Sequence, residues 1–249
     1  MSELLHTECP DIILCQETKV DQHILSNELF PKVFVSFRKD RNSAGGGVCI
    51  TSNRKLRVTH CSDLDVSDLE AVWVQFHTHS FTPLYICSIY RPPDKGPDYI
   101  ALLRKPLEEL THRHPHKPPF IIIRGDMNYP TVNWISVTTP DMSADNFLDL
   151  LNDFHLQQLV NVPTRHSQSV SYILNLVLTS YPASIPDLTV DREFSDHCIV
   201  SFNVLLAPTF THTPPCKFFL YNRGDYDQLR ADLDDFQCSF LSPIQIQIQ

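Results

Sequence analysis

The chain has 249 residues, of which 42% are hydrophobic and 20% charged, and this is enough for one sizeable core. The formal net charge of -9 argues against a protein that binds nucleic acid through a basic surface alone, because neutralising phosphates requires Lys and Arg. A metal-dependent enzyme stays compatible with this charge, since a bound cation supplies positive charge locally.

Targeting signals and cysteine motifs are absent from the sequence. The eight cysteines form no CxxC pair, so neither a zinc ribbon nor a thioredoxin-type site is expected. The first residues lack the basic region and apolar run of a secretory signal. No apolar stretch approaches the ~20 residues of a transmembrane helix. We therefore expect an intracellular protein, nuclear or cytoplasmic, with no membrane partner.

Short apolar, β-branched runs between turn signals predict eight strands and two helices. The strands are expected at 11–16, 33–38, 47–51, 69–77, 84–90, 120–125, 173–179 and 198–205. One helical face runs through 99–110 and should be kinked by Pro106, and the other runs through 147–154 with Ser143 as N-cap. Strands joined by hairpins and helical crossovers favour a mixed α/β sandwich over a doubly wound parallel sheet.

The composition changes near residue 207, where a proline-rich segment begins. We expect one domain over residues 1–206, followed by a linker and short helical tail over 207–249. The tail helix would be lined by Tyr226, Leu229, Leu233 and Phe236.

Polar residues suited to catalysis recur where the predicted strands begin or end. These residues are Glu17, Tyr90, Asp126, Asn128, Asp196 and His197. Strand ends along one rim of a sheet are where open α/β proteins gather their sites. Carboxylate, phenol, amide and imidazole groups meeting there would suit metal-assisted hydrolysis.

Each of these residues also has an ordinary structural interpretation. Glu17 alone would be a solvated loop residue, and Asp126 and Asn128 would belong to a turn, since Gly, Asp and Asn all favour turns. Tyr90 would sit at the edge of the core with its hydroxyl in water, and Asp196 would cap a strand. The ordered combination makes a coincidence improbable.

Six segments in order carry a resemblance to a known family. They read CPDIILCQETKV, GGGVCIT, ICSIYRPP, IIIRGDMNYPTVNW, LVNVPTR and FSDHCIVSF. Over residues 9–206 the chain resembles the endonuclease/exonuclease/phosphatase superfamily, in particular the endonuclease domain of non-LTR (LINE-type) retrotransposons, relatives of apurinic/apyrimidinic endonucleases. The resemblance implies a four-layer α/β sandwich of two packed mixed β-sheets flanked by helices.

The same resemblance implies a hydrolase that nicks DNA with Mg²⁺, for which Mn²⁺ can substitute. Glu17 and Asp196 would lie at the metal, and Asp126 would activate water. Tyr90 would bind a phosphate oxygen or assist the leaving group, and His197 would stabilise charge in the transition state.

Three further residues would contact the substrate, namely Asn128, Thr164 and Ser195. Residues 218–233 resemble the connector that precedes a reverse transcriptase domain in such elements.

Two departures from the family predict weakened catalysis. The family has Asp where this chain has Asn175, at the position that orients the histidine, and an amide supplies no negative charge to hold an imidazolium. The family also begins with an Asn-bearing strand, which we expect to be missing before Cys9, as in a truncated copy. Two alternatives therefore stay open: a catalytically inactive retrotransposon relic, and a phosphatase of the same superfamily.

Overall fold

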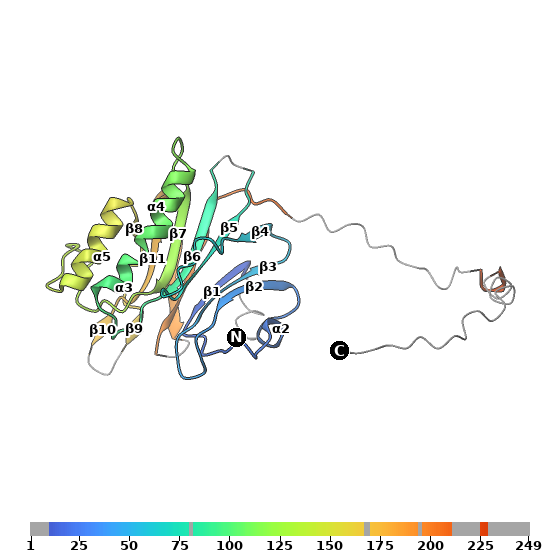
Figure 1. The fold of residues 1–249 in the computed structure, drawn as a ribbon, viewed down its shortest axis with the longest axis horizontal. Helices are drawn as coiled ribbons and strands as arrows, with labels where there is room; N and C mark the ends of the chain where they lie inside the picture. Colours follow the sequence, from blue (N-terminus) through green and yellow to red (C-terminus); the bar gives the residue numbers. More distant parts are fainter. Residues whose placement is uncertain (1–9, 80–81, 167–169, 194–195, 211–224, 229–249) are drawn as a thin grey trace. The chain divides into compact units, whose positions relative to one another are not determined.

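A computed structural model describes residues 10–79, 82–166, 170–193, 196–210 and 225–228 (Figure 1). Contacts divide the chain into a compact unit of residues 1–211 and a second unit of residues 212–249. In the second unit, residues 226–228 are helical, and the rest of the predicted tail helix lies outside the described residues. The predicted boundary at residue 206 stays a prediction.

A six-stranded mixed sheet forms the centre of the first unit. In spatial order it contains β4 (Val58–His60), β5 (Ala71–Phe76), β6 (Leu84–Tyr90), β7 (Phe120–Asp126), β11 (Asn175–Thr179) and β8 (Gln157–Gln158). The β6–β7 pair is parallel, and the other neighbours are antiparallel. Strands β6 and β11 are buried along their whole length, which explains their nearly continuous apolar sequence.

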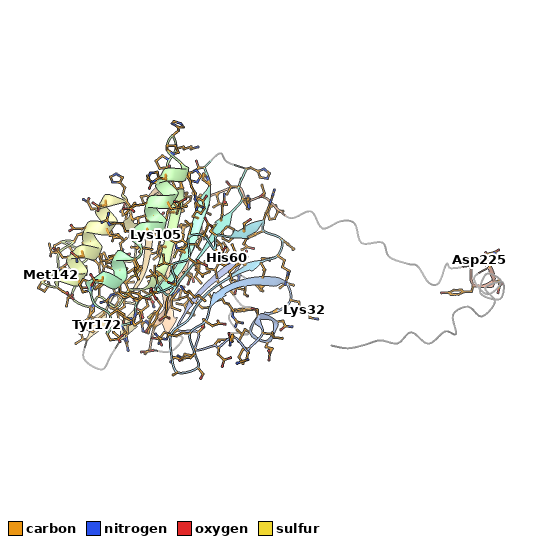
Figure 2. All side chains as sticks on the ribbon, in the orientation of Figure 1. Lys32, His60, Lys105, Met142, Tyr172 and Asp225 are labelled. Carbon is orange, nitrogen blue, oxygen red and sulfur yellow. The ribbon has the colours of Figure 1, made fainter. Side chains whose placement is uncertain are left out.

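Three helices cover one face of this sheet: α3 (Pro97–Ala101), α4 (Arg104–Arg113) and α5 (Met142–Asp153) (Figure 1). Their buried side chains join a core cluster that includes Trp73, Leu107, Ile123 and Phe147. Figure 2 shows Lys105 and Met142 on this helical side of the unit.

Two helix details differ from the sequence prediction. The segment around 99–110 is two helices and not one kinked helix, and Pro106 lies in the first turn of α4, where the amide that proline lacks would have no helical partner. The N-cap prediction at Ser143 is wrong. Asp141 caps α5, because its carboxylate accepts a hydrogen bond from the Ser143 amide at 2.8 Å.

Two smaller antiparallel sheets pack on the other face of the six-stranded sheet. One has the order β1 (Ile12–Gln16), β3 (Val48–Asn53), β2 (Phe34–Lys39), and the other pairs β12 (Leu188–Glu193) with β13 (Cys198–Phe202). Side chains from both small sheets join one apolar cluster with Val72, Ile122 and Val177 of the large sheet. The mixed α/β sandwich predicted from the sequence is confirmed.

The remaining elements are short. They are α2 (Ser26–Leu29), the hairpin strands β9 (Arg165–His166) and β10 (Ser171–Tyr172), and the 3₁₀ turn η1 (Pro182–Ser184). The sequence analysis missed β4, β8, β9, β10 and β12, most of which have only two or three residues. The expected missing first strand concerns residues outside the described part of the chain.

Within the described residues, no helix has the length and apolar character needed to cross a bilayer. Cys15, Cys49, Cys61 and Cys87 are free thiols.

Candidate functional site

Three neighbouring strands of the large sheet place polar residues at the same end of the sheet. The parallel register of β6 and β7 sets Tyr90 beside Asp126. Strand β11 runs antiparallel to β7 and begins at Asn175, which pairs with the same Asp126. All three residues are buried. The sheet register therefore holds a phenol, a carboxylate and an amide in one row.

Glu17 reaches this row from the opposite sheet. It directly follows β1, which packs against β6 and β7. Its backbone has φ 49°, a left-handed conformation that is uncommon outside glycine. The Tyr90 hydroxyl donates a hydrogen bond to Glu17 Oε1, and Lys19 Nζ lies 3.6 Å from Glu17 Oε2. The contact joins the two layers of the sandwich at the site.

Asp126 is a buried carboxyl that has Glu17, His197 and Arg124 as charged or titratable neighbours. Burial raises the pKa of Asp126, and the nearby Glu17 carboxylate also raises it, whereas His197 lowers it. Asp126 Oδ1 accepts a hydrogen bond from the Asn128 amide at 3.1 Å. Asn128, at φ 48°, donates through Nδ2 to the Arg91 carbonyl at 2.8 Å. The GDMN segment is therefore the end of β7 and the start of the loop after it, and it carries polar groups into the site.

His197 stands between two carboxylates. Its Nε2 is 3.9 Å from Asp126 Oδ2 and 3.9 Å from Asp196 Oδ2. On the other side of the ring, Nδ1 lies 3.1 Å from Asn175 Nδ2. Asp196 is 58% exposed at its side chain and pairs with Arg165 at 2.9 Å. The imidazole therefore connects the buried row to the exposed Asp196.

Thr164 holds the start of β11 next to the site. It is fully buried, and its hydroxyl accepts hydrogen bonds from the amides of Leu174 at 3.0 Å and Asn175 at 2.9 Å. This placement differs from the substrate contact expected for Thr164, because the hydroxyl is used in holding the start of β11. Ser195 lies outside the described residues.

The structure adds Arg91, which the sequence analysis missed. This buried side chain donates to the carbonyl of Asn128 at 3.3 Å and to that of Lys95, and its guanidinium lies 4.2 Å from the centre of the Tyr129 ring. Its position directly after Tyr90, in IYRPP, was the available signal. Arg91 holds the loop that carries Asn128.

The oxygen-rich donor set fits a hard divalent cation. Glu17 and Asp126 are close enough for the Glu17 charge to raise the pKa of Asp126. A cation beside them would relieve this repulsion, and Mg²⁺ prefers such oxygen ligands while keeping several waters. Among the described residues, no three His, Cys, Asp or Glu side chains are grouped closely enough to hold a metal by themselves. Water and a substrate phosphate would have to supply the other ligands.

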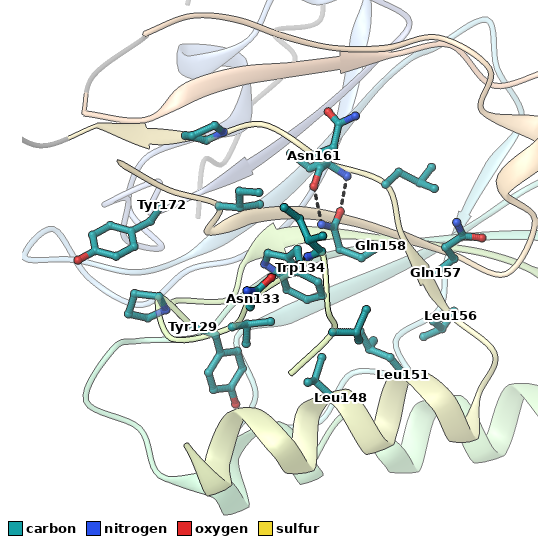
Figure 3. A pocket seen from close by; sticks show the side chains of 18 of the residues that line it. Tyr129, Asn133, Trp134, Leu148, Leu151, Leu156, Gln157, Gln158, Asn161 and Tyr172 are labelled. Carbon is teal, nitrogen blue, oxygen red and sulfur yellow. Dashed lines mark hydrogen bonds between the residues drawn. The ribbon is translucent and has the colours of Figure 1, made fainter. Parts of the chain in front are cut away.

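A separate cavity of about 720 Å³ opens between α5, the loop after β7 and the hairpin β9–β10 (Figure 3). Tyr129, Trp134 and Tyr172 are among its lining residues, and Lys, Arg, Asp and Glu are not. None of the predicted catalytic residues lines it either. The cavity therefore does not provide the charged site.

Residues 84–201 match the family described as endonuclease-reverse transcriptase. The endonuclease domain of TRAS1, a telomere-specific non-LTR retrotransposon, matches at 20% identity and TM-score 0.64, over 82% of this chain and 90% of that chain. A 3′ phosphatase, NExo, from Neisseria, bound to a product DNA hairpin, matches at 17% identity and TM-score 0.59, over 82% and 92% of the two chains.

An AP endonuclease from Archaeoglobus fulgidus matches at 17% identity and TM-score 0.54, over 81% of this chain and 92% of that chain. An endonuclease/exonuclease/phosphatase family protein from Leptotrichia buccalis matches at TM-score 0.52 with 11% identity, over 82% and 90%. No curated protein matches the chain. At these identities the solved structures establish the fold, which agrees with the family matched by residues 84–201.

Proposed function

We propose that this chain, which has the endonuclease/exonuclease/phosphatase fold and matches the endonuclease-reverse transcriptase family over residues 84–201, is a Mg²⁺-dependent phosphodiesterase that nicks DNA. The observation that carries the proposal is the convergence of Glu17, Tyr90, Asp126 and His197 at one end of the sandwich. Two carboxylates, a phenol and an imidazole from both layers meet there, and each suits a step of phosphodiester hydrolysis.

Glu17 would hold the cation, with Asp196 close to it, and Mn²⁺ could replace Mg²⁺. The bound cation would neutralise phosphate charge in the transition state. The chain itself has the formal net charge of -9, so a cation is the most direct way for it to approach a phosphate.

Asp126 would accept the proton of the attacking water. Burial raises its pKa, which makes the carboxylate a better proton acceptor at neutral pH than an ordinary exposed aspartate. Asn128 would bind the phosphate through its amide. The pKa of Tyr90 is also raised, mainly by burial and then by its hydrogen bond to Glu17, so its hydroxyl stays neutral and donates a hydrogen bond.

His197 would stabilise the developing negative charge, and its support is weak in this chain. An aspartate at position 175 would accept the Nδ1 proton and favour the imidazolium. The Asn175 amide can present either a donor or an acceptor to Nδ1, so it does not select the charged form. This observation favours the second candidate, a relic that keeps the fold and binds nucleic acid with little or no catalysis.

Supercoiled plasmid separates these candidates. We expect the wild-type chain to convert it to the nicked form with Mg²⁺ and not with EDTA, and to release no phosphate from inositol phosphates tested beside it. Phosphate release without nicking would support a phosphatase. No reaction with either substrate would support the inactive relic.

The remaining assignments follow from the retrotransposon likeness. DNA would be the partner, a reverse transcriptase domain would follow the tail in the parent element, and the protein would act in the nucleus or cytoplasm. The free thiols of Cys15, Cys49, Cys61 and Cys87 suit such a reducing compartment.

A further inference from the structure

Glu70 lies outside the predicted catalytic set. Its side-chain and backbone polar groups all form hydrogen bonds with segments that build the site. It immediately precedes β5, and its side chain is 15% exposed. One carboxylate oxygen accepts from Arg41 Nη1 at 2.7 Å, and the other accepts from the Gly47 amide at 2.7 Å. Its carbonyl accepts from the Tyr90 amide at 2.8 Å. The residue therefore contacts both the loop beside Glu17 and the strand that carries Tyr90.

The loop at Gly45–Gly47 transmits the first contact to Glu17. The carbonyls of Gly46 and Gly47 accept hydrogen bonds from the amides of Lys19 at 3.0 Å and Thr18 at 3.2 Å. These two hydrogen bonds involve the residues directly after Glu17, and they stabilise its left-handed backbone conformation. A shift of the glycine loop would therefore shift the Glu17 carboxylate.

The shape of this loop depends on the Arg41–Glu70 ion pair. Gly46 has φ 72°, and a Cβ there would lie 2.4 Å from the Arg41 guanidinium and 2.5 Å from Glu70 Oε2. Arg41 also donates through Nε to the Gly45 carbonyl at 2.7 Å. The ion pair and the glycines fit together closely, so the loop has little freedom while the pair is intact.

The second contact holds Tyr90 from two sides. Besides the bond from the Tyr90 amide to the Glu70 carbonyl, the Tyr99 hydroxyl donates to the Tyr90 carbonyl at 3.1 Å and accepts from the Glu70 amide at 2.8 Å. Because the Tyr90 hydroxyl in turn donates to Glu17, the contacts close a ring that runs from Glu70 through the glycine loop and Glu17 to Tyr90.

We propose that Glu70 is a positioning residue that sets the spacing of Glu17 and Tyr90 and so prepares the site for a divalent cation. The inference rests on the proposed function, since it assigns the cation to Glu17. Arg41 neutralises the Glu70 carboxylate, which leaves Glu17 as the carboxylate offered to the cation at this side of the site.

The test measures Mn²⁺ binding by calorimetry, with the metal alone, together with plasmid nicking. In Glu70→Ala we expect about a 10–100-fold loss of Mn²⁺ affinity or of kcat, the range typical when a residue that orients metal ligands is removed. KM for DNA should change less than about threefold, because Glu70 is not expected to touch DNA. Glu70→Gln keeps the size and one acceptor, so it should restore part of the loss.

The matched control is Asp153→Asn, which breaks the exposed Arg104–Asp153 pair and should change neither quantity. Melting temperatures show whether each variant is folded. If Glu70→Ala does not fold, the same measurements are made on Glu70→Gln. Unchanged Mn²⁺ affinity and kcat in folded Glu70 variants, beside an active wild type, would overturn the inference alone. A wild type that neither binds Mn²⁺ nor nicks would overturn the proposed function, and this inference with it.

Discussion

Asn175 contacts His197, the candidate catalytic histidine. It sits where a carboxylate would hold the His197 imidazolium, 3.1 Å from Nδ1. We expect Asn175→Asp to raise the Mg²⁺-dependent nicking rate at least tenfold, since by analogy the loss of the aspartate that orients the histidine of a serine-protease triad lowers kcat by about 10⁴. The rate is measured on supercoiled plasmid. An unchanged rate in both Asn175→Asp and Glu17→Ala would favour the inactive relic.

Asp126 gives a prediction at the same scale that couples activity to stability. Burial raises the pKa of Asp126 in the folded chain above its value in the unfolded chain. At pH values between these two pKa values, the folded chain binds more protons than the unfolded chain. The free energy of unfolding therefore falls as the pH rises through this range. Asp126→Asn removes this charge and keeps an acceptor for the Asn128 amide. It should raise the melting temperature at pH 7, lose that gain below about pH 4, and reduce nicking by about 10²–10⁴-fold. A lower melting temperature at pH 7 would contradict the assigned cause of the shift.

The polar residues at strand ends were predictable from the sequence. The residues that hold them in position were not. Glu17, Asp126 and His197 stand out in the sequence because each adjoins an apolar run. Glu70 and Arg41 lie 29 positions apart and meet only through the fold, so no local pattern identifies them. Thr164 was expected at the substrate, but its burial shows a use that sequence spacing cannot reveal.

Strands β6 and β7 are the elements that bring the site together. These parallel neighbours approach each other closely where Gly125 pairs with Ile89, because a Cβ at Gly125 would lie 2.1 Å from the Ile89 carbonyl oxygen and 2.5 Å from Ile89 Cγ2. Gly125→Ala should therefore push the two strands apart, lower the free energy of unfolding by about 3 kcal/mol and reduce nicking. Gly96→Ala is the control, since nothing lies within 4 Å of its Cβ, and it should cost less than about 1 kcal/mol. Chemical denaturation measures both; equal effects would refute the close approach.

Long apolar strands were predictable to within a few residues, whereas short elements were not. β6 appears at the predicted residues 84–90, because a buried parallel strand has a continuous apolar sequence. β8, β9 and β10 have two residues each, too few for any periodicity. The N-cap of α5 was assigned to Ser143, yet both Asp141 and Ser143 are good caps, and only the backbone geometry distinguishes them.

At the scale of the whole molecule, we expect the net charge to make DNA binding depend on a divalent cation. A formal charge of -9 leaves little attraction for phosphates, so we expect weak binding to duplex DNA in EDTA and tighter binding with Mg²⁺ or with Ca²⁺, which we expect to support binding without cleavage. Fluorescence anisotropy at several salt concentrations measures this. Tight, strongly salt-dependent binding in EDTA would mean that a basic surface carries the affinity.

Anomalous diffraction from crystals soaked in Mn²⁺ would show directly whether Glu17 and the row around Asp126 form a divalent-cation site. We expect an anomalous peak within coordination distance of a Glu17 carboxylate oxygen in the wild type and none there in Glu17→Gln. Wild-type crystals with no peak at Glu17, or with the metal bound only elsewhere, would contradict it.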